Sequence, residues 1–228
     1  MTKIPSAKRA VIACGIFEVE FGRLLKGRDD IHVNYLEQGL HVKPEKIAPR
    51  LQEIVDDVAK WADEIILAYG LCSNGVAGVL APAQGLIVPK AHDCIPLFIG
   101  SLEKYKESST AHPGTYYLNS GWINGELDPL GTLERYKERL DPEMAEWGIK
   151  EEMKHYTRIA YIDGNSTESV AEIERAKRNA NFLKKDFQII EGSGAYLNKL
   201  LFGPYDREEF FHIPPGETIN QNFYLKSR

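Results

Sequence analysis

The stretch Glu64–Gly75, EIILAYGLCSNG, joins an apolar run to a polar turn that contains a cysteine. An uninterrupted apolar run of this length is typical of a strand that is buried on both faces of a parallel sheet. The glycine, serine and asparagine that follow indicate a turn. Apolar runs also lead to Cys14, in AVIACG, and to Cys94, in LIVPKAHDC. The sequence therefore predicts several buried strands that each end near a cysteine.

Predicted strands and helices alternate along the whole chain. The strands are expected at residues 9–14, 31–38, 64–70, 85–93, 114–122, 158–164 and 186–192, with an edge strand near 208–219 stopped by Pro214 and Pro215. The helices are expected at residues 18–26, 44–62, 75–83, 95–107, 166–185 and 195–203. This alternation predicts an α/β fold with a mainly parallel, Rossmann-like sheet and helices on both faces.

The length of the chain suits one domain. It has 228 residues, 43% of them hydrophobic, which is enough to form a substantial core. Residues 127–155 are charged and aromatic, and they read as two helices separated by the sequence DPE. We therefore expect a single α/β domain over residues 1–228 with a helical insertion at about 127–155.

Charge and hydropathy exclude several kinds of partner. The formal net charge is −5, and lysine and arginine are spread along the chain, which argues against nucleic acid. No stretch approaches the roughly 20 apolar residues that a membrane helix needs. The apolar run Ala10–Ala13 is too short for the core of a signal peptide. We expect a cytoplasmic protein that acts on a small molecule and has no nucleic-acid or membrane partner.

The three cysteines are the strongest functional signal. In a reducing compartment, an odd number of cysteines favours buried thiols, metal ligands or redox groups over a disulfide framework. Ligands of open α/β sheets bind beyond the carboxyl ends of the strands, where Cys14, Cys72 and Cys94 are all expected. Three thiolates repel one another unless a cation lies among them, so we predict a metal site. Ordinary packing of buried cysteines remains the alternative.

The neighbours of the cysteines suggest which group they bind. His92 as a fourth ligand would give a tetrahedral site of three cysteines and one histidine, which suits zinc. Alternatively, three thiolates could hold three irons of a 4Fe–4S cluster and leave one iron open to substrate. His92 and Asp93 would then be acid/base candidates, together with Glu20, which follows Cys14 in the chain. An ordinary turn residue remains the other interpretation of His92.

Other strand ends supply candidate contacts with a cofactor or substrate. Tyr69 and Gly70 end the third predicted strand, and Trp122 ends the fifth. Ser193 and Gly194 form a flexible turn before a helix, whose free amides could orient a ligand. A core tryptophan and an ordinary turn are the alternatives. The glycines of YGLCSNGVAG lack the spacing of a nucleotide-binding loop.

Several segments resemble the family catalogued as domain of unknown function 1638. They are YGLCSNG (69–75), PKAHDCI (89–95) with LFIGS (97–101), YYLNSGW (116–122), GSGAYLNKLLFGPYD (192–206) and PPG (214–216). The HDC segment followed by GS is the most specific of them. The resemblance covers Cys14, Glu20, Tyr69, Gly70, Cys72, His92, Asp93, Cys94, Ser101, Trp122, Gly192 and Pro215.

This resemblance implies a metabolic context and does not specify a reaction. Members of the family often accompany corrinoid-dependent methyltransferases, which implies one-carbon metabolism and corrinoid methyltransferase proteins as partners. The expected function is thus a metal- or cluster-binding protein, with or without enzymatic turnover, in corrinoid-linked methyl metabolism. The alternatives are a non-catalytic accessory protein that binds a partner or delivers a corrinoid or metal, and a thiol-containing sugar- or acid-binding protein without a metal.

Overall fold

The chain forms two compact units in the computed structural model, which describes residues 8–164 and 169–225. The first unit combines residues 1–97 with residues 195–228, and the second consists of residues 98–194. The expected single α/β domain over residues 1–228 stays a prediction. No helix within the described ranges is both long and apolar enough to cross a membrane.

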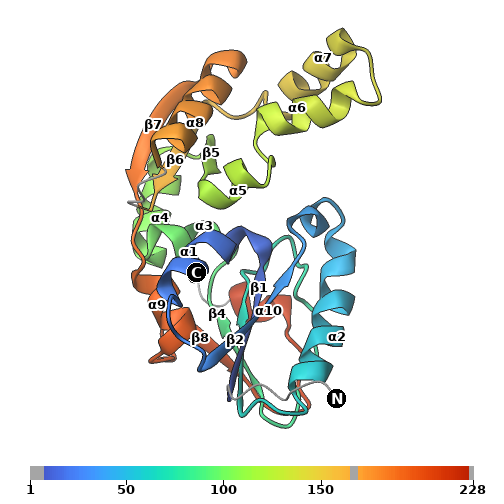
Figure 1. Cartoon of the computed structure of the whole chain (residues 1–228), viewed down its shortest axis with the longest axis vertical. Helices are drawn as coiled ribbons and strands as arrows, with labels where there is room; N and C mark the ends of the chain where they lie inside the picture. The colour runs from blue at the N-terminus through green and yellow to red at the C-terminus, as the bar shows by residue number, and fades with distance from the viewer. Residues whose placement is uncertain (1–7, 165–168, 226–228) are drawn as a thin grey trace. The chain divides into compact units, whose positions relative to one another are not determined.

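The first unit contains a five-stranded sheet with the order β2-β1-β3-β4-β8. The strands are β1 (Arg9–Cys14), β2 (Ile31–Leu36), β3 (Glu64–Ala68), β4 (Leu86–Pro89) and β8 (Phe210–Ile213). The first four are parallel, and β8 pairs antiparallel with β4 at the edge of the sheet. The carboxyl ends of β1 to β4 therefore share one edge of the sheet (Figure 1).

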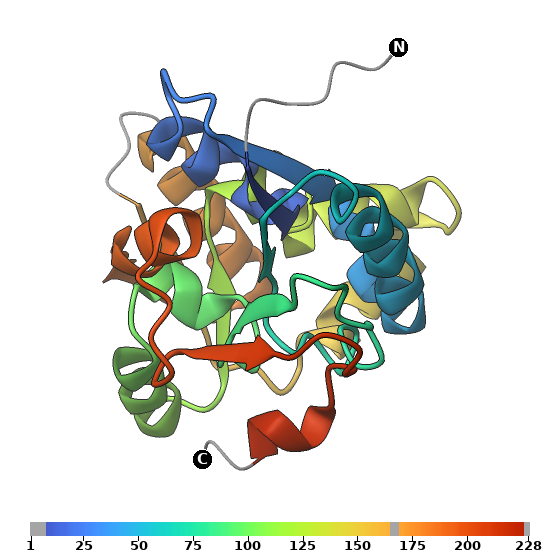
Figure 2. The same ribbon diagram turned by 90° about the horizontal axis from the view of Figure 1, so that it is seen from below.

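Helices cover both faces of this sheet. They are η1 (Gly15–Phe17), α1 (Glu18–Leu24), η2 (Gln38–Val42), η3 (Pro44–Lys46), α2 (Ile47–Val58), α9 (Ala195–Phe202) and α10 (Gln221–Leu225). The amphipathic α2 buries Ile47, Leu51, Val55 and Val58 on one side, as their helical spacing predicts. It lies on one face of the sheet, and α1 and α9 lie on the other (Figures 1 and 2).

The helix predicted at residues 75–83 is absent, and the chain forms turns there. Cys72, Ser73 and Asn74 have consecutive positive φ angles of 47°, 55° and 67°, and Gly78 has a φ of 93°. Left-handed backbone of this kind cannot continue into a right-handed α-helix. The small residues of this segment therefore allow tight turns beside the end of β3.

The second unit has a separate three-stranded parallel sheet, β5-β6-β7. Its strands are β5 (Thr115–Leu118), β6 (Arg158–Asp163) and β7 (Asp186–Glu191), and its helices are α4 (Leu102–Ala111), α5 (Ser120–Asn124), α6 (Pro129–Lys137), α7 (Pro142–Glu152) and α8 (Ser169–Leu183). The helix predicted at 95–107 is divided into α3 (Ile95–Ile99) and α4. Gly100, with a φ of 86°, separates them, and the Ser101 hydroxyl caps α4.

The predicted helical insertion corresponds to α6 and α7, which are joined by a short turn (Figure 1). Leu133 of α6 and Ile149 of α7 are buried in the same apolar cluster as Leu118 of β5 and Tyr161 of β6. The helix pair is thus part of the core of the second unit. The predicted α/β class with mainly parallel strands is confirmed, with the strands divided between two sheets.

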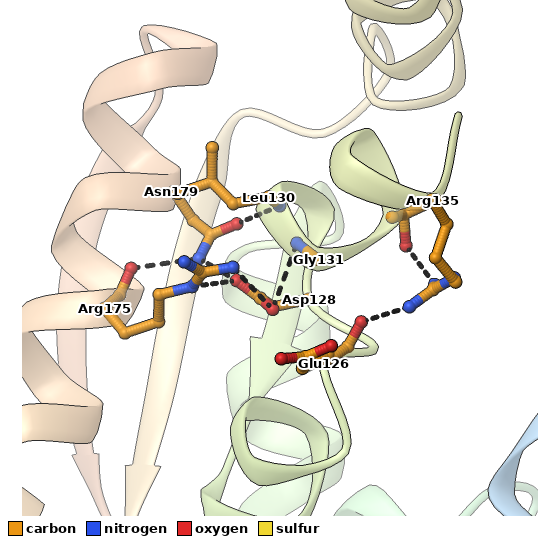
Figure 3. A network of polar contacts seen from close by, with 8 residues as sticks. Glu126, Asp128, Leu130, Gly131, Arg135, Arg175 and Asn179 are labelled. Carbon is orange, nitrogen blue, oxygen red and sulfur yellow. Dashed lines mark hydrogen bonds and ion pairs between the residues drawn. The ribbon is translucent and has the colours of Figure 1, made fainter. Parts of the chain in front are cut away.

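A buried carboxylate fixes the start of α6. Asp128 is fully buried and accepts hydrogen bonds from Nε of Arg175 at 2.8 Å, Nδ2 of Asn179 at 2.5 Å and the backbone N–H of Gly131 at 3.3 Å (Figure 3). Oδ1 of Asn179 in turn accepts from the N–H of Leu130 at 2.8 Å. The amide of Leu130 is therefore tied to Asn179 of α8, 49 residues further along the chain, and the amide of Gly131 is tied to α8 through Asp128.

We predict that Asp128→Ala lowers the free energy of unfolding by about 3 kcal/mol, the lower end of the range for breaking a buried ion pair. The lower end is expected because the Arg175 side chain is 27% exposed. Asp141→Ala is the matched control, since Asp141 caps α7 in the same way but is exposed and forms no ion pair with the residues that the structure describes. It should cost only about 1 kcal/mol. Urea denaturation measures both, and equal losses would contradict this role for Asp128.

Candidate functional site

Strand register brings Cys14 beside Tyr69 at the carboxyl edge of the first unit's sheet. Ala13 of β1 pairs with Ala68 of β3, so the next residues along the two parallel strands, Cys14 and Tyr69, are neighbours. Each is 1% exposed, and after burial an interaction with Cys14 adds to the rise in the pKa of Tyr69. Two residues predicted for the site are therefore in direct contact.

The chain segments that leave β3 and β4 run side by side. The N–H of Leu71 donates to the carbonyl of Ala91 at 2.9 Å, and the N–H of Cys72 donates to the carbonyl of His92 at 3.0 Å. Gly70 lies so close to Asp93 that a Cβ atom there would be 2.6 Å from the Asp93 carbonyl carbon. Only glycine fits this approach without moving the backbone. The two loops are consequently held together just before Cys72 and Cys94.

The thiols of Cys72 and Cys94 are in contact. Their Sγ atoms are 3.7 Å apart, and the residues are 6% and 5% exposed. The hydrogen bond with Cys72 and then burial raise the pKa of the Cys94 thiol well above its usual value, although a hydrogen bond from the Gly70 backbone opposes the rise. Without a cation, Cys94 is therefore a neutral thiol at neutral pH.

A histidine that the sequence analysis did not select lies beside Cys14. His41, in η2, is exposed, and its Nδ1 is 3.2 Å from the Gln38 carbonyl oxygen. The contact with Cys14 raises the pKa of His41 to about 9 despite the opposing effect of desolvation. The residue follows β2 just as the cysteines follow their strands. The strand-end reasoning used for the cysteines could have found His41 if it had been applied to β2.

The three thiols all interact electrostatically with one tyrosine. Burial raises the pKa of the Tyr69 hydroxyl far above its usual value, and Cys14, Cys94 and Cys72 all add to the rise. Among residues 8–164 and 169–225, however, no three His, Cys, Asp or Glu side chains are positioned as they stand to hold a metal ion. The Cys72 and Cys94 thiols are in contact with each other, whereas Cys14 interacts with Tyr69 and His41.

The other polar residues predicted for this unit have different surroundings. His92 is exposed, and its ring centroid is 6.2 Å from that of Tyr224 in α10. Asp93 accepts a hydrogen bond from the N–H of Ile95 at 2.8 Å, at the start of α3. Glu20 lies on α1, where its charge contributes to raising the pKa of Tyr35 in β2. Their predicted roles in acid/base chemistry, and that of His92 in metal binding, stay predictions.

Trp122, Ser193 and Gly194, which were predicted to contact a cofactor, belong to the second unit. Trp122 lies in α5 and packs on Phe98, with ring centroids 5.8 Å apart. Ser193 follows β7, and its N–H donates to the Phe98 carbonyl at 3.1 Å. Their local contacts are those of core and turn residues, and their predicted contacts with a cofactor stay untested.

Comparison with protein-family models gives one match, to the family described as protein of unknown function (DUF1638), over residues 35–201. The chain belongs to this family. The matched region includes His41, Cys72 and Cys94, and it begins after Cys14. Comparisons with curated proteins and with solved structures give no match.

We predict that diamide, which accepts two hydrogens and becomes the hydrazine, links Cys72 to Cys94 in the reduced, metal-free protein. Their sulfurs need to approach only from 3.7 Å to about 2.05 Å. Cys14 should remain free, because its side-chain partners are Tyr69 and His41. Alkylation followed by peptide mass spectrometry identifies the linked pair. A disulfide that contains Cys14 as the main product would contradict this arrangement.

We further predict that Gly70→Ala slows this cross-linking and destabilises the protein by about 1–3 kcal/mol, the usual cost of overpacking a buried contact. The added methyl group would meet backbone atoms of Asp93 and not the end of a flexible side chain. The backbones of residues 70 and 93 would therefore have to move apart. Gly22→Ala is the control, since nothing lies within 4 Å of a Cβ atom at that position in α1. Cross-linking at the rate of the unmodified protein would show that this contact does not hold the thiols together.

Proposed function

We propose that the first unit binds a thiophilic metal centre through Cys14, Cys72 and Cys94. The observation that carries the proposal is the contact of two buried, free thiols, Cys72 and Cys94, whose sulfurs are 3.7 Å apart. The third buried thiol, Cys14, ends a strand at the same edge of the sheet. Thiolates are soft ligands that select zinc, copper(I) and iron–sulfur clusters. Free thiols persist in a reducing compartment, which supports a cytoplasmic setting.

The sulfur separation favours a single ion over a cluster. Two thiolates on one tetrahedral zinc, each at about 2.3 Å, are about 3.8 Å apart. The distance between Cys72 and Cys94 is close to this value, although it is also that of a simple contact between thiols. In a 4Fe–4S cluster each cysteine binds a different iron, so the two sulfurs would have to separate. Zinc therefore fits the pair better, and the cluster is the alternative that metal analysis must distinguish.

Binding requires Cys14 to join the pair. The described side chains do not form a closed cage as they stand, so Cys14 must turn from Tyr69 and His41 towards the ion. Such closure is common, because metal sites often form fully only when the ion binds and the thiols lose their protons. A bound zinc would keep a small thiol ionised at the fourth position. Methyl transfer to or from such a thiol, in corrinoid-linked one-carbon metabolism, is the reaction class that we propose.

Elemental analysis of protein purified without oxygen tests the metal site. We expect about one zinc per chain and a loss of affinity of at least about a hundredfold in both Cys72→Ser and Cys94→Ser, because each removes a thiolate ligand. Ser73→Ala is the matched control, since Ser73 is exposed in the same left-handed turn. Iron and acid-labile sulfide in place of zinc would assign the cluster.

Metal content that is unchanged in both serine variants would refute the proposal. Failure of the purified, reduced protein to bind either zinc or a reconstituted cluster would also refute it. Circular dichroism of each variant separates a lost ligand from a lost fold.

A non-catalytic role as an accessory protein is the second candidate, and an exposed apolar stripe favours it. Met144 and Trp147 of α7 are 49% and 62% exposed, and Leu140 just before the helix is 44% exposed. Met144 and Trp147 are three positions apart, so they share one side of α7. Solvent-exposed tryptophan and methionine are enriched in protein interfaces. A corrinoid methyltransferase protein is the partner that the proposed pathway suggests.

If α7 docks such a partner, Trp147→Glu should weaken co-elution with a corrinoid methyltransferase protein by at least about tenfold, because it removes a potential interface anchor. Metal content should not change. Val170→Glu is the control, since Val170 is 73% exposed but lies on α8. Equal co-elution of both variants would rule out the stripe as the docking surface.

A further inference from the structure

We propose that the outer edge of β7 is a homodimer interface, at which the β7 strands of two copies of the chain pair antiparallel. Among the described strands, β7 pairs only with β6, and it forms one margin of the second unit's sheet (Figure 1). An edge strand presents a row of backbone groups that another chain can pair with. This pairing is independent of the metal centre proposed above, since β7 contains no cysteine.

Hydrogen bonds to β6 show which backbone groups of β7 point outward. At the start of the strand, the N–H of Asp186 donates to the Thr157 carbonyl at 3.2 Å. Just after its end, the N–H of Gly192 donates to the Asp163 carbonyl at 2.9 Å. Successive residues of a strand direct their N–H and C=O groups to opposite sides, so the even-numbered residues face β6. The outward groups belong to the odd-numbered residues Phe187, Ile189 and Glu191.

The outer edge of β7 is open along its whole length. Its outward N–H and C=O groups form no hydrogen bond with residues 8–164 or 169–225. Edge strands that avoid pairing usually carry a proline, a bulge or a central charge. The ladder from β6 to β7 is continuous, and the middle of β7 reads FQII. Ile189 is 46% exposed, although Tyr161, its partner on β6, is fully buried.

The direction of the backbone groups restricts how two β7 strands can pair. In an antiparallel pair, two residues that lie opposite each other both point their N–H and C=O groups at the partner or both point them away. Odd-numbered residues must therefore face odd-numbered ones, and one residue faces itself across the two-fold axis. With Gln188 on that axis, Phe187 faces Ile189 of the second copy, and Lys185 faces Glu191.

This register is complementary in charge. Lys185 precedes β7 and Glu191 ends it, and neither side chain has an ion-pair or hydrogen-bond partner in the part of the chain that the structure describes. Opposite charges that face each other across two strands are stabilising, and like charges are destabilising. The two-fold axis forms each Lys185–Glu191 pair twice and covers Ile189 with Phe187. An axis through Ile189 would instead place Phe187 opposite Glu191.

The other sheet margins are less suited to a second copy. Asp29 and Asp30 precede β2, and Glu37 follows it, so antiparallel pairing of two β2 strands would bring acidic residues together. β5 and β8 have only four residues each. β8 also ends at Pro214 and Pro215, which cannot donate to a ladder. β7 is therefore the margin that fits self-association.

Sedimentation equilibrium of the reduced full-length protein tests the pairing. Two paired strands bury less than the roughly 1,200 Å² of a standard interface, so we expect a reversible dimer with a dissociation constant of about 1–100 μM. Lys185→Glu and Glu191→Lys should each weaken this dimer by at least about tenfold, because two pairs of like charges then face each other. Lys184→Glu is the matched control, since it makes the same charge change at a residue that faces Gly192 and not Glu191.

Mixing the two weakened variants is the decisive measurement. In a dimer of one Lys185→Glu chain and one Glu191→Lys chain, both contacts again join opposite charges. An equimolar mixture should therefore regain the affinity of the unmodified protein, although neither variant dimerises well alone. A change that merely damaged the fold of one variant would not be repaired by the other.

Cross-linking tests the register. The groups of Gln188 point to β6, so across the axis its Cα atom would lie about 4.5 Å from that of its own copy, which is within the range of a disulfide. Gln188→Cys should thus form a covalent dimer when its two thiol hydrogens pass to diamide. Ile190→Cys is the control on the same face of the strand, and it should not form one because it faces Asp186. The native cysteines are all buried.

Three results would overturn the proposal. The first is a monomer at every concentration up to about 1 mM. The second is a dimer whose affinity is unchanged by both charge reversals, or lost equally in Lys184→Glu. The third is a failure of the mixed variants to associate while circular dichroism shows both to be folded. Faster cross-linking of Ile190→Cys than of Gln188→Cys would contradict the register centred on Gln188.

Discussion

The close backbone contact between Gly70 and Asp93 is the constraint on which the candidate site depends. It lets the exits of β3 and β4 continue side by side beyond the sheet, where two interstrand hydrogen bonds extend their pairing. Cys72 and Cys94 lie directly after this contact, which explains why residues 22 positions apart have their sulfurs 3.7 Å apart. A side chain at position 70 would separate the loops and, with them, the thiols.

The turn that carries Cys72 is held in a costly conformation. Cys72, Ser73 and Asn74 are three successive non-glycine residues with a left-handed backbone. This conformation costs about 1–2 kcal/mol per residue. Such strain persists only where the surrounding structure enforces it, and it is concentrated at functional sites. Here the hydrogen bond from Cys72 to His92 and the packing around Gly70 enforce it. The backbone of Cys72 is therefore held in the position that places its thiol beside that of Cys94.

The site and the second unit use buried polar groups in different ways. Asp128 is surrounded by donors from α6 and α8, so its charge is matched and its effect is to fix the helices. Near Tyr69, three thiols lie at one edge of the sheet, and no ion pair is formed there among the described side chains. An arrangement with many soft donors and little charge compensation is suited to receive a cation, whereas the Asp128 network is already complete.

The sequence by itself determined the α/β class, most of the strands and helices, and the position of the three cysteines at strand ends. These features depend on local apolar periodicity, which each segment carries in its own residues. The sequence did not locate the turns at residues 72–78, because the left-handed backbone there depends on contacts with the neighbouring loop.

Only the tertiary structure decided that the parallel strands form two sheets and that His41 lies beside Cys14. Strand order and register are set by pairing between segments far apart in the chain, and no local pattern encodes which strand ends become neighbours. For the same reason His92, two residues before Cys94 in sequence, lies near Tyr224, while the more distant His41 interacts with Cys14.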